Sequence, residues 1–444
     1  MWGTLIDKFR AAFAGAGEPR CFRAPGRVNL IGEHTDYNGL PVLPMTIAQE
    51  IRVVAAPRAD DRVILRNTDP SFPPLEFMND GAISPSAPGS WDNYAKAAVT
   101  GISQSLAPNH RAGFCLLADA DLPNGAGLSS SSALVVACAL AYMDALGLAL
   151  EQDVPRLKLA SLLAEAEHFV GTRGGGMDQA VILAGAAGRA CKIDFFPLRV
   201  ESAPLPDDCA VVVCDSTIKA EKSGAARALY NMNPRLCHLG CALVRAQLSE
   251  EFGEEVEVGR LGDLWYGPLC LTTREAQALF ARAVPEGPMP LHLIAQRLRQ
   301  KPEKVMARWL EEVPQTNGGY DILARLRHQA AEYRRVETAR DALTAGDPAA
   351  LGRLMNESHA SCRDNLAIST PELDRLTEIA LEAGALGARL TGAGFGGATV
   401  NLVPADRVER FIETVGRRYY EEYLGRDGDT PIFVAQTSPG AGPV

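Results

Sequence analysis

The stretch LPNGAGLSSSSALVVACA, residues 122–139, predicts a loop that leads directly into the first turn of a helix. Gly125 and Gly127 precede four serines, and a run of good helix formers follows. The first turn of a helix exposes backbone N–H groups at the positive end of the helix dipole, and glycine lets an oxygen atom approach closely. A serine hydroxyl there can also ligate magnesium. The stretch fits a phosphate site, and it fits a serine-capped core helix equally well.

The composition indicates a protein of several domains that is not built to bind nucleic acid or a membrane surface. With 444 residues, of which 47% are hydrophobic, the chain can form two or three domains. Its net charge of -10 argues against nucleic acid and anionic membranes as partners, because both favour basic surfaces. A phosphate site in this chain must therefore depend on local groups.

The cysteines and the first residues favour a cytoplasmic protein. No two of the ten cysteines form a C-x-x-C pair, and several, such as Cys138 and Cys214, lie in apolar surroundings that suit reduced thiols. Residues 2–13 place apolar side chains at helical spacing, but charges interrupt the run that a signal peptide needs. The apolar stretch 133–150 contains Asp144 and is too short to span a membrane comfortably.

A polar loop follows a strand predicted at residues 21–30. The sequence IGEHTDYNGLPVLPM, residues 31–45, is punctuated by glycine and proline, so no regular period can place its polar side chains in a core. The group singled out consists of Arg27, Glu33, His34, Asp36, Tyr37 and Asn38. So many polar groups in one segment indicate a hydroxyl-rich ligand, and the alternative is a solvated loop without a role.

An acidic residue follows three consecutive glycines in the sequence GGGMDQ, residues 174–179. The glycines allow other groups to approach the backbone, so Asp178 is suited to contact a substrate hydroxyl. The structural alternative is that Asp178 is the N-cap of the segment 179–183. A helix predicted before it, at residues 154–169, carries Glu167 near its end.

A third glycine-rich segment, LTGAGFGGATVNLV, occupies residues 390–403. Gly392, Gly394 and Gly397 match G-x-G-x-x-G, but that dinucleotide fingerprint requires a following helix, and ATVNLV alternates like a strand. No G-x-x-x-x-G-K-[ST] is present, which excludes a P-loop. A glycine turn before a strand can instead bring backbone close to a nucleotide or to the first glycine loop.

The second half of the chain is predicted to be mostly helical, after a domain boundary near Pro204 and Pro206. Helices are expected at residues 225–248, 322–343 and 349–358. The tail from Ser438 to Val444 is rich in glycine and proline, and we expect it to be disordered.

In this order, the three glycine-bearing motifs and the polar loop resemble the GHMP small-molecule kinases, and among them the galactokinase family. GRVNLIGEHTDYNG at residues 26–39 is similar to the galactokinase signature, LPNGAGLSSSSA at 122–133 to the ATP-phosphate motif, and LTGAGFGGATV at 390–400 to the third motif. GGGMDQ and SHASCRDNLAISTPELD, the latter at residues 358–374, match as well. The resemblance runs in patches from about residue 21 to residue 403.

The resemblance implies an α+β fold with the two-domain GHMP kinase architecture. Residues 1–205 would form a ribosomal-protein-S5-domain-2-like N-terminal domain. Residues 206–444 would form a ferredoxin-like C-terminal domain with helical additions, including an insertion at about residues 250–317. The active site would lie in the cleft between the two domains.

The resemblance also assigns roles to residues, with ATP and Mg²⁺ as cofactors. Arg27 would stabilise the transferring phosphoryl group, and Asp178 would be the base or orienting acceptor for the C1 hydroxyl of galactose. The residues that would bind the sugar are Glu33, His34, Asp36, Gly175 and Tyr230. Those that would hold the ATP phosphates are Gly125, Gly127, Ser129, Ser130 and Ser131, and those that would bind magnesium are Ser131 and Glu167.

The activity that the resemblance implies is ATP-dependent phosphorylation of galactose to galactose 1-phosphate, and two alternatives stay open. The sequences GGGMDQ, SHASCRD and LTGAGFGG resemble those of the branch that includes N-acetylgalactosamine kinase and plant galactokinases. N-acetylgalactosamine is therefore an alternative substrate. A non-catalytic sugar and ATP sensor is the alternative of another class. The expected partners are these small molecules, without nucleic acid or membrane, and the expected state is a monomer or a weak homo-oligomer.

Overall fold

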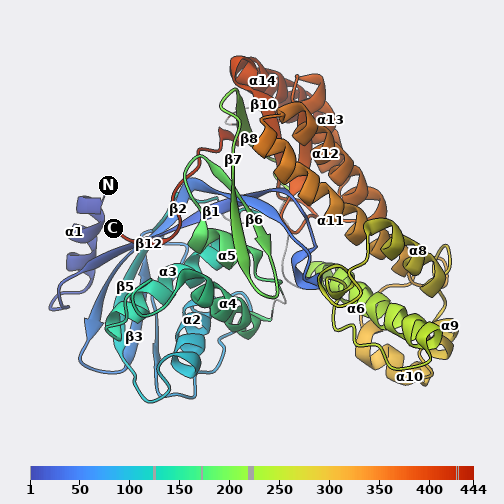
Figure 1. The fold of residues 1–444 in the computed structure, drawn as a ribbon. Helices are drawn as coiled ribbons and strands as arrows, with labels where there is room; N and C mark the ends of the chain where they lie inside the picture. Colours follow the sequence, from blue (N-terminus) through green and yellow to red (C-terminus); the bar gives the residue numbers. More distant parts are fainter. Residues whose placement is uncertain (1, 124–126, 172–173, 219–224, 427, 429) are drawn as a thin grey trace.

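The computed structural model describes residues 2–123, 127–171, 174–218, 225–426, 428 and 430–444, and the backbone alone of residues 225–228 and 230. Within these residues helices and sheets are mixed, which confirms the α+β class. Figure 1 shows a large sheet with helices on the left, a smaller sheet with helices at the top, and a group of helices at the lower right.

The large sheet has the strand order β12-β1-β2-β5-β3-β4. Its strands are β1 (Arg20–Ile31), β2 (Leu43–Arg58), β3 (Arg62–Asn67), β4 (Leu75–Met78), β5 (Gly113–Ala120) and β12 (Gly442–Pro443). Successive side chains of a strand point to opposite faces, so Val53 packs in the main core, whereas Val54 packs with α1 (Trp2–Ala12). Because both faces are covered, β2 is apolar along much of its length.

Helices cover the face of the large sheet that lies opposite α1 (Figure 1). They are α2 (Asp92–Ser105), α3 (Ser130–Ala145), α4 (Arg156–Ala166) and α5 (Met177–Ala184). The central helix α3 contacts β1, β2 and α2, which explains why its sequence is apolar on nearly every side. A hairpin of β6 (Arg189–Asp194) and β7 (Arg199–Pro204) follows.

The smaller sheet is antiparallel, with the order β11-β8-β10-β9. Its strands are β8 (Cys209–Asp215), β9 (Gly387–Thr391), β10 (Ala398–Pro404) and β11 (Ile432–Val434), and the helices α12 (Pro348–Ser361), α13 (Pro371–Glu382) and α14 (Val408–Val415) pack near it. Val212 faces the cluster formed with α13 and α14, whereas Val213 joins the main core. A strand follows the glycines of the third motif, so the rejection of a dinucleotide fingerprint is confirmed.

The third part is a group of helices around an apolar cluster of its own. It contains α6 (Ala225–Phe252), α7 (Asp263–Tyr266), α8 (Thr273–Ala283), α9 (Leu291–Arg297), α10 (Pro302–Val305) and the first turns of α11 (Ile322–Ala345). Helix α11 connects this cluster to the main core, since Leu326 packs in the first and Val336 in the second. It runs from the lower right towards the upper sheet in Figure 1.

The expected disorder of residues 438–444 is wrong. The strand β12 pairs with β1, and the Val444 N–H donates to Cys21 O at 3.0 Å. The Ser438 hydroxyl donates to Ile47 O at 2.9 Å. A Cβ at Gly440 would lie 2.4 Å from Leu183 O. The glycines and prolines of this tail therefore serve close packing on an open sheet edge, where the sequence alone suggested flexibility.

Two chemical expectations can be compared with the structure. All ten cysteines are free thiols, as the sequence predicted. Among the helices that the structure describes, none combines the length and the apolar character needed to cross a membrane.

Candidate active site

The motifs singled out in the sequence meet at one cavity of about 310 Å³. The predicted residues that line it are Arg27, Glu33, His34, Asp36, Gly127, Ser129, Ser130, Ser131, Glu167 and Asp178, together with the third motif from Thr391 to Gly394. Gly175 lines a larger neighbouring cavity of about 1,370 Å³. Gly125 lies outside the described residues, and of Tyr230 only the backbone, in α6, is described.

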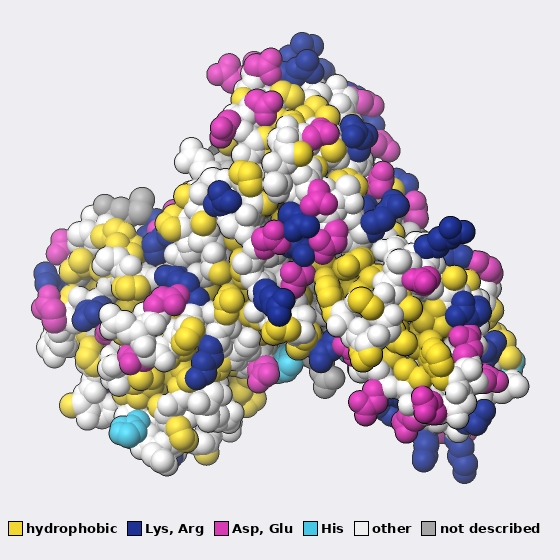
Figure 2. Space-filling view, in the orientation of Figure 1, with side chains coloured by type: hydrophobic (Ala, Val, Ile, Leu, Met, Phe, Trp, Pro, Cys, Tyr) yellow, Lys and Arg dark blue, Asp and Glu magenta, His cyan; other side chains and the backbone are white. Residues whose placement is uncertain are grey.

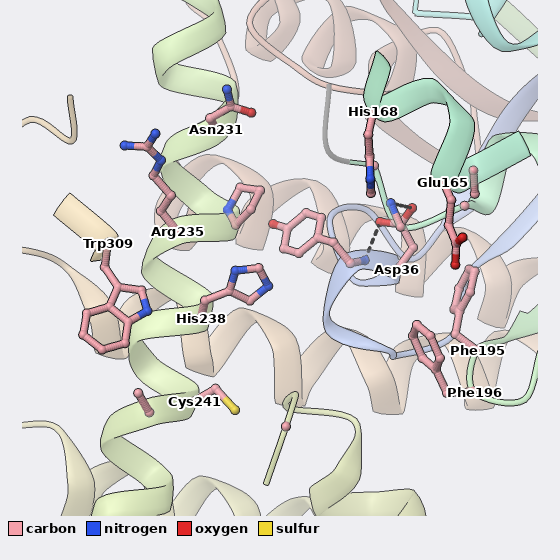
Figure 3. A pocket seen from close by; sticks show the side chains of 18 of the residues that line it. Asp36, Glu165, His168, Phe195, Phe196, Asn231, Arg235, His238, Cys241 and Trp309 are labelled. Atoms are coloured by element: carbon pink, nitrogen blue, oxygen red, sulfur yellow. Dashed lines mark hydrogen bonds between the residues drawn. The ribbon is translucent and has the colours of Figure 1, made fainter. Parts of the chain in front are cut away.

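The larger cavity adjoins the smaller one. Asp36, Gly174 and Gly176 line both cavities. Figure 3 shows Glu165, His168, Phe195 and Phe196 on the side of the large sheet, and Asn231, Arg235, His238 and Trp309 on the side of the helical part. The larger cavity lies between these two parts, whereas the smaller one is lined by residues of the large-sheet part and by the third motif. The lining of the larger cavity mixes cationic, anionic and aromatic side chains.

The loop before α3 has the backbone geometry of a strained functional turn. Gly127 and Ser129 have φ of +75° and +62°, and the helix begins at Ser130, so the predicted passage from a loop into a helix is confirmed. A left-handed conformation costs energy for a serine, and such costs are typical of ligand-binding loops. The first turn of α3 and the hydroxyls of Ser130 and Ser131 therefore border the cavity with the positive end of the helix dipole.

Asp178 and Arg27 form an ion pair beside this turn. Asp178 is the second residue of α5, and Gly176 is the N-cap, so the N-cap alternative for Asp178 is wrong. Its Oδ1 accepts a hydrogen bond from Arg27 Nε at 2.7 Å, and its Oδ2 accepts one from the Ser129 hydroxyl. Arg27 Nη1 also donates to Gly127 O at 2.5 Å. Burial by itself would lower the pKa of Arg27, but the neighbouring carboxylates, Asp178 first, raise it, so the guanidinium stays charged.

Asp36 connects the polar loop to the triple glycine. Its Oδ2 accepts hydrogen bonds from Gly175 N at 3.0 Å and Met177 N at 3.4 Å, and its Oδ1 accepts one from Tyr37 N at 2.9 Å. Burial, assisted by the charge of Asp178, raises the pKa of Asp36 to about 6 despite these donors. In this structure the N–H of Gly175, predicted to contact sugar, is thus bonded to Asp36.

The carboxylate of Glu33 is fixed by the third motif. Its Oε1 accepts hydrogen bonds from Gly392 N at 2.9 Å and from Arg389 Nη1 at 3.2 Å. Arg389 is completely buried in β9, and this ion pair offsets part of the cost of its burial. The ion pair fixes Glu33 at the edge of the cavity without any local secondary structure.

His34 bonds to two different segments. Its Nε2 lies 3.2 Å from Ala393 O, and its Nδ1 lies 3.1 Å from the Tyr37 hydroxyl. A carbonyl can only accept, so Nε2 carries the proton and Nδ1 accepts. Burial lowers the pKa of His34, so the imidazole is neutral near pH 7.

Glu167 and the serines offer hard oxygen donors that fit Mg²⁺. The Ser132 hydroxyl donates to Glu167 at 3.0 Å and Gln179 Nε2 donates to the same carboxylate, while Ser131 and Asp178 line the cavity beside it. Among the described residues no group of three or more acidic, His or Cys side chains forms a ready metal site. A magnesium ion would therefore complete its shell with nucleotide phosphates and water, as this ion commonly does.

Comparisons with known proteins identify the family. The model "Galactokinase galactose-binding signature" matches residues 7–57, "GHMP kinases N terminal domain" matches 93–186, and "GHMP kinases C terminal" matches 339–422. A galactokinase of Roseiflexus sp. (strain RS-1) is 36% identical over 446 aligned residues, which cover 100% of this chain and 97% of the relative. The chain belongs to the galactokinase family. The galactokinase of Bos taurus is 33% identical over 99% of this chain and 96% of its own.

Solved structures agree with this place in the galactokinase family. The crystal structure of Lactococcus lactis galactokinase complexed with galactose has a TM-score of 0.78 and 29% identity, and covers 99% of both chains. The mevalonate kinase of Methanococcus jannaschii, at 16% identity and a TM-score of 0.56, shares the fold alone. The two-domain GHMP kinase fold is therefore confirmed, and so is the expectation that the protein is a sugar kinase, an enzyme of the phosphotransferase class.

Several residues around the cavity of this galactokinase-family chain were not predicted from its sequence. Arg389, Ser132 and Gln179 contact the predicted groups directly. Two signals were available: an arginine inside the apolar strand GARLT requires a buried partner, and Gln179 directly follows Asp178. The serine next to Glu167 in this structure is Ser132, one residue after the predicted ligand Ser131.

Proposed function

We propose that the protein transfers the γ-phosphoryl group of ATP to the C1 hydroxyl of galactose, giving galactose 1-phosphate and ADP. The observation that carries the proposal is the ion pair of Arg27 with Asp178 beside the first turn of α3. Phosphoryl transfer requires mainly alignment of the reactants and neutralisation of charge, rather than covalent work by the protein. A cation, a carboxylate and an exposed helix N-terminus in one cavity supply these requirements.

Each group near the ion pair has a distinct part in the proposed reaction. The backbone N–H groups at the start of α3, with Ser129 and Ser130, bind the ATP phosphates. Arg27 stabilises negative charge on the moving phosphoryl group. Its guanidinium also favours the ionised form of Asp178, which accepts a hydrogen bond from the C1 hydroxyl and orients its oxygen for attack.

The proposed sugar site lies on the other side of Asp178. Asp36, Glu33 and His34 line the cavity there. The carboxylates of Asp36 and Glu33 present acceptors to the remaining hydroxyls, His34 packs beside them, and Gly175 and Tyr230 complete the pocket. The galactose in the complexed Lactococcus lactis galactokinase supports this substrate. The sequences of the glycine motifs support N-acetylgalactosamine as a second candidate acceptor, to be compared with galactose.

A coupled assay of ADP release tests the function. With ATP and magnesium present, we expect galactose to stimulate ADP release and to give a higher kcat/KM than N-acetylgalactosamine. A higher value for N-acetylgalactosamine would identify it as the substrate. Tight binding of both ligands without ADP release would favour the sensor alternative.

We propose that Glu167 and Ser131 would hold Mg²⁺, which would neutralise part of the negative charge of the ATP phosphates. Removing one oxygen ligand weakens a metal site, so Ser131→Ala should raise the magnesium concentration for half-maximal rate about tenfold. The rate at saturating magnesium should change much less. A magnesium titration that is identical to that of the wild type would contradict this role of Ser131.

Sugar binding should weaken as the pH falls through about 6. The pKa of Asp36 is raised to about 6, so this carboxylate loses its charge, and with it a strong hydrogen-bond acceptor, below that pH. The titration of Asp36 cannot itself weaken folding, because a raised carboxyl pKa contributes stability to the folded state as the pH falls through this range. Calorimetric titration with galactose between pH 5 and 8 measures the effect, and Asp36→Asn should bind weakly with no such dependence.

A further inference from the structure

We infer that one face of α11, formed by His328, Gln329 and Glu332, is a positioning element that fixes the backbone of the substrate loop Gly32 to His34 and thereby sets the affinity for the sugar. The inference rests on the proposed function, since it takes Glu33 and His34 as sugar ligands. The face lies about three hundred residues further along the chain than the loop, so no local structure provides this support.

The backbone of the substrate loop depends on side chains for hydrogen bonds, and one of these is close in sequence: the Thr35 hydroxyl donates to Gly32 O at 3.0 Å. It begins where β1 ends, and Gly32 and His34 have φ of +101° and +58°, which turn the chain out of the sheet. A buried N–H or C=O group without a partner is costly, so each group of this loop requires one from elsewhere. The side chains of Glu33 and His34 meanwhile line the cavity.

Helix α11 supplies one hydrogen bond to each of the three loop residues. Glu332 Oε1 accepts from Gly32 N at 2.9 Å. His328 Nε2 donates to Glu33 O at 2.9 Å, and Gln329 Nε2 donates to His34 O at 2.8 Å. The three helix side chains are completely buried, and positions i, i+1 and i+4 share one side of a helix.

The acceptor end of this face is itself fixed. Glu332 accepts hydrogen bonds from Arg335 Nε at 2.7 Å and from the Ser358 hydroxyl at 2.5 Å. Burial alone would raise the pKa of Glu332, but Arg335 and its other charged neighbours lower it to about 2, so the acceptor is ionised near pH 7.

The donor end is also defined. His328 Nδ1 accepts from the Ser361 hydroxyl at 2.9 Å, which leaves the proton on Nε2, towards the loop. Burial lowers the pKa of His328 to about 4, so the ring stays neutral and keeps this tautomer near pH 7. Ser358 and Ser361 are both residues of α12. Two helices of the second half of the chain, α11 and α12, therefore hold the substrate loop of the first half.

A matched pair of variants separates positioning from general stabilisation. Gln329 and Asn401 are both fully buried, each donates its amide nitrogen to one backbone carbonyl, and the amide oxygen of each has no hydrogen-bond partner among the described residues. Asn401 lies in β10, outside the cavity, and donates to Val212 O at 3.0 Å and also to the Thr399 hydroxyl at 3.1 Å and to Cys214 Sγ at 3.5 Å. Asn401→Leu therefore removes the same kind of bond to a backbone carbonyl as Gln329→Met, and two further bonds with it.

We expect both variants to melt at lower temperature, and only one to lose sugar affinity. By calorimetry, Gln329→Met should bind galactose roughly tenfold to a hundredfold more weakly, as expected when a buried carbonyl loses its donor. Its KM for ATP and its kcat at saturating galactose should stay within about twofold of the wild type. Wild-type galactose affinity in Gln329→Met, or an equal loss in Asn401→Leu, overturns the inference.

A second series keeps the test decisive if Gln329→Met does not fold. The amide nitrogen of glutamine reaches the position of Nε2 of a histidine, so His328→Gln can still donate to Glu33 O, whereas His328→Leu cannot. We expect His328→Gln to retain most of the galactose affinity and His328→Leu to lose it. Equal affinities of these two variants overturn the inference.

The assay of the wild type distinguishes a failure of the proposed function from a failure of the positioning role of α11. If the wild type does not phosphorylate galactose, the proposed function and this inference fall together. If it does, and the variants bind galactose normally, only the positioning role of α11 falls.

Discussion

Replacing Asp178 by asparagine is expected to lower kcat roughly 10²- to 10⁴-fold while the affinity for ATP stays near that of the wild type. Asparagine keeps the shape of the side chain and an oxygen for Arg27 Nε, which lies 2.7 Å from the carboxylate. It removes the negative charge that would orient and deprotonate the sugar hydroxyl. Single-turnover ADP release and binding of a fluorescent ATP analogue measure the two quantities separately.

A second ion pair of the large sheet provides the control for this variant. Arg52 and Asp119 lie 2.9 Å apart with side chains 7% and 27% exposed, compared with 6% and 24% for Arg27 and Asp178. The Arg52 pair lies outside both cavities. Arg52 has a second partner, Asp121, at 2.9 Å, so Asp119→Asn should cost no more stability than Asp178→Asn and should leave kcat unchanged. Near-normal turnover in Asp178→Asn, or an equal loss in Asp119→Asn, would refute the assigned role.

Adding one methyl group at residue 175 is expected to abolish measurable galactose binding. A Cβ at Gly175 would lie 2.2 Å from the backbone carbon of Asp36 and from Tyr37 N, so the polar loop must move for the side chain to fit. That movement breaks the hydrogen bond of Gly175 N to Asp36. Overpacking of this kind also costs about 1–3 kcal/mol of unfolding free energy. Thermal unfolding and calorimetric titration of Gly175→Ala with galactose give both numbers.

The neighbouring glycine provides a control for this substitution. A Cβ at Gly174 meets no described atom within 4 Å, and its φ is not in the left-handed region. Gly174→Ala should therefore fold with wild-type stability and bind galactose normally. If Gly175→Ala bound galactose as well as Gly174→Ala does, the close contact between the triple glycine and the polar loop would be wrong.

The sequence was informative where the chain is irregular. Glycines in left-handed conformations, such as Gly127 and Gly176, mark turns that few other residues can form, so the positions of Ser129 and Asp178 near them could be predicted. Regular elements could also be predicted: α3 from its run of good helix formers, and β10 from the alternation of its side chains. In the folded chain these motifs line one cavity.

The supports of the site could not be predicted in the same way. Glu332 and Gly32 are 300 residues apart, and nothing local in α11 reveals that its charged residues are buried, because they resemble a solvated helix face. The partner of Arg389 could not be predicted either, since Glu33 lies 356 residues away. Pairing across such distances depends on how the parts of the fold pack, and composition alone misled for the tail at residues 438–444.

The pairing of β12 with β1 affects how the protein is made. A ribosome releases residues 20–31 early, but it releases residues 442–443 only after every residue that lines the catalytic cavity has been synthesised. Until then, the outer edge of the strand that carries Arg27 presents unpaired backbone groups, which can recruit strands of other nascent chains. We therefore expect translation products that stop short of residue 442 to aggregate, even when every residue of the catalytic cavity is present.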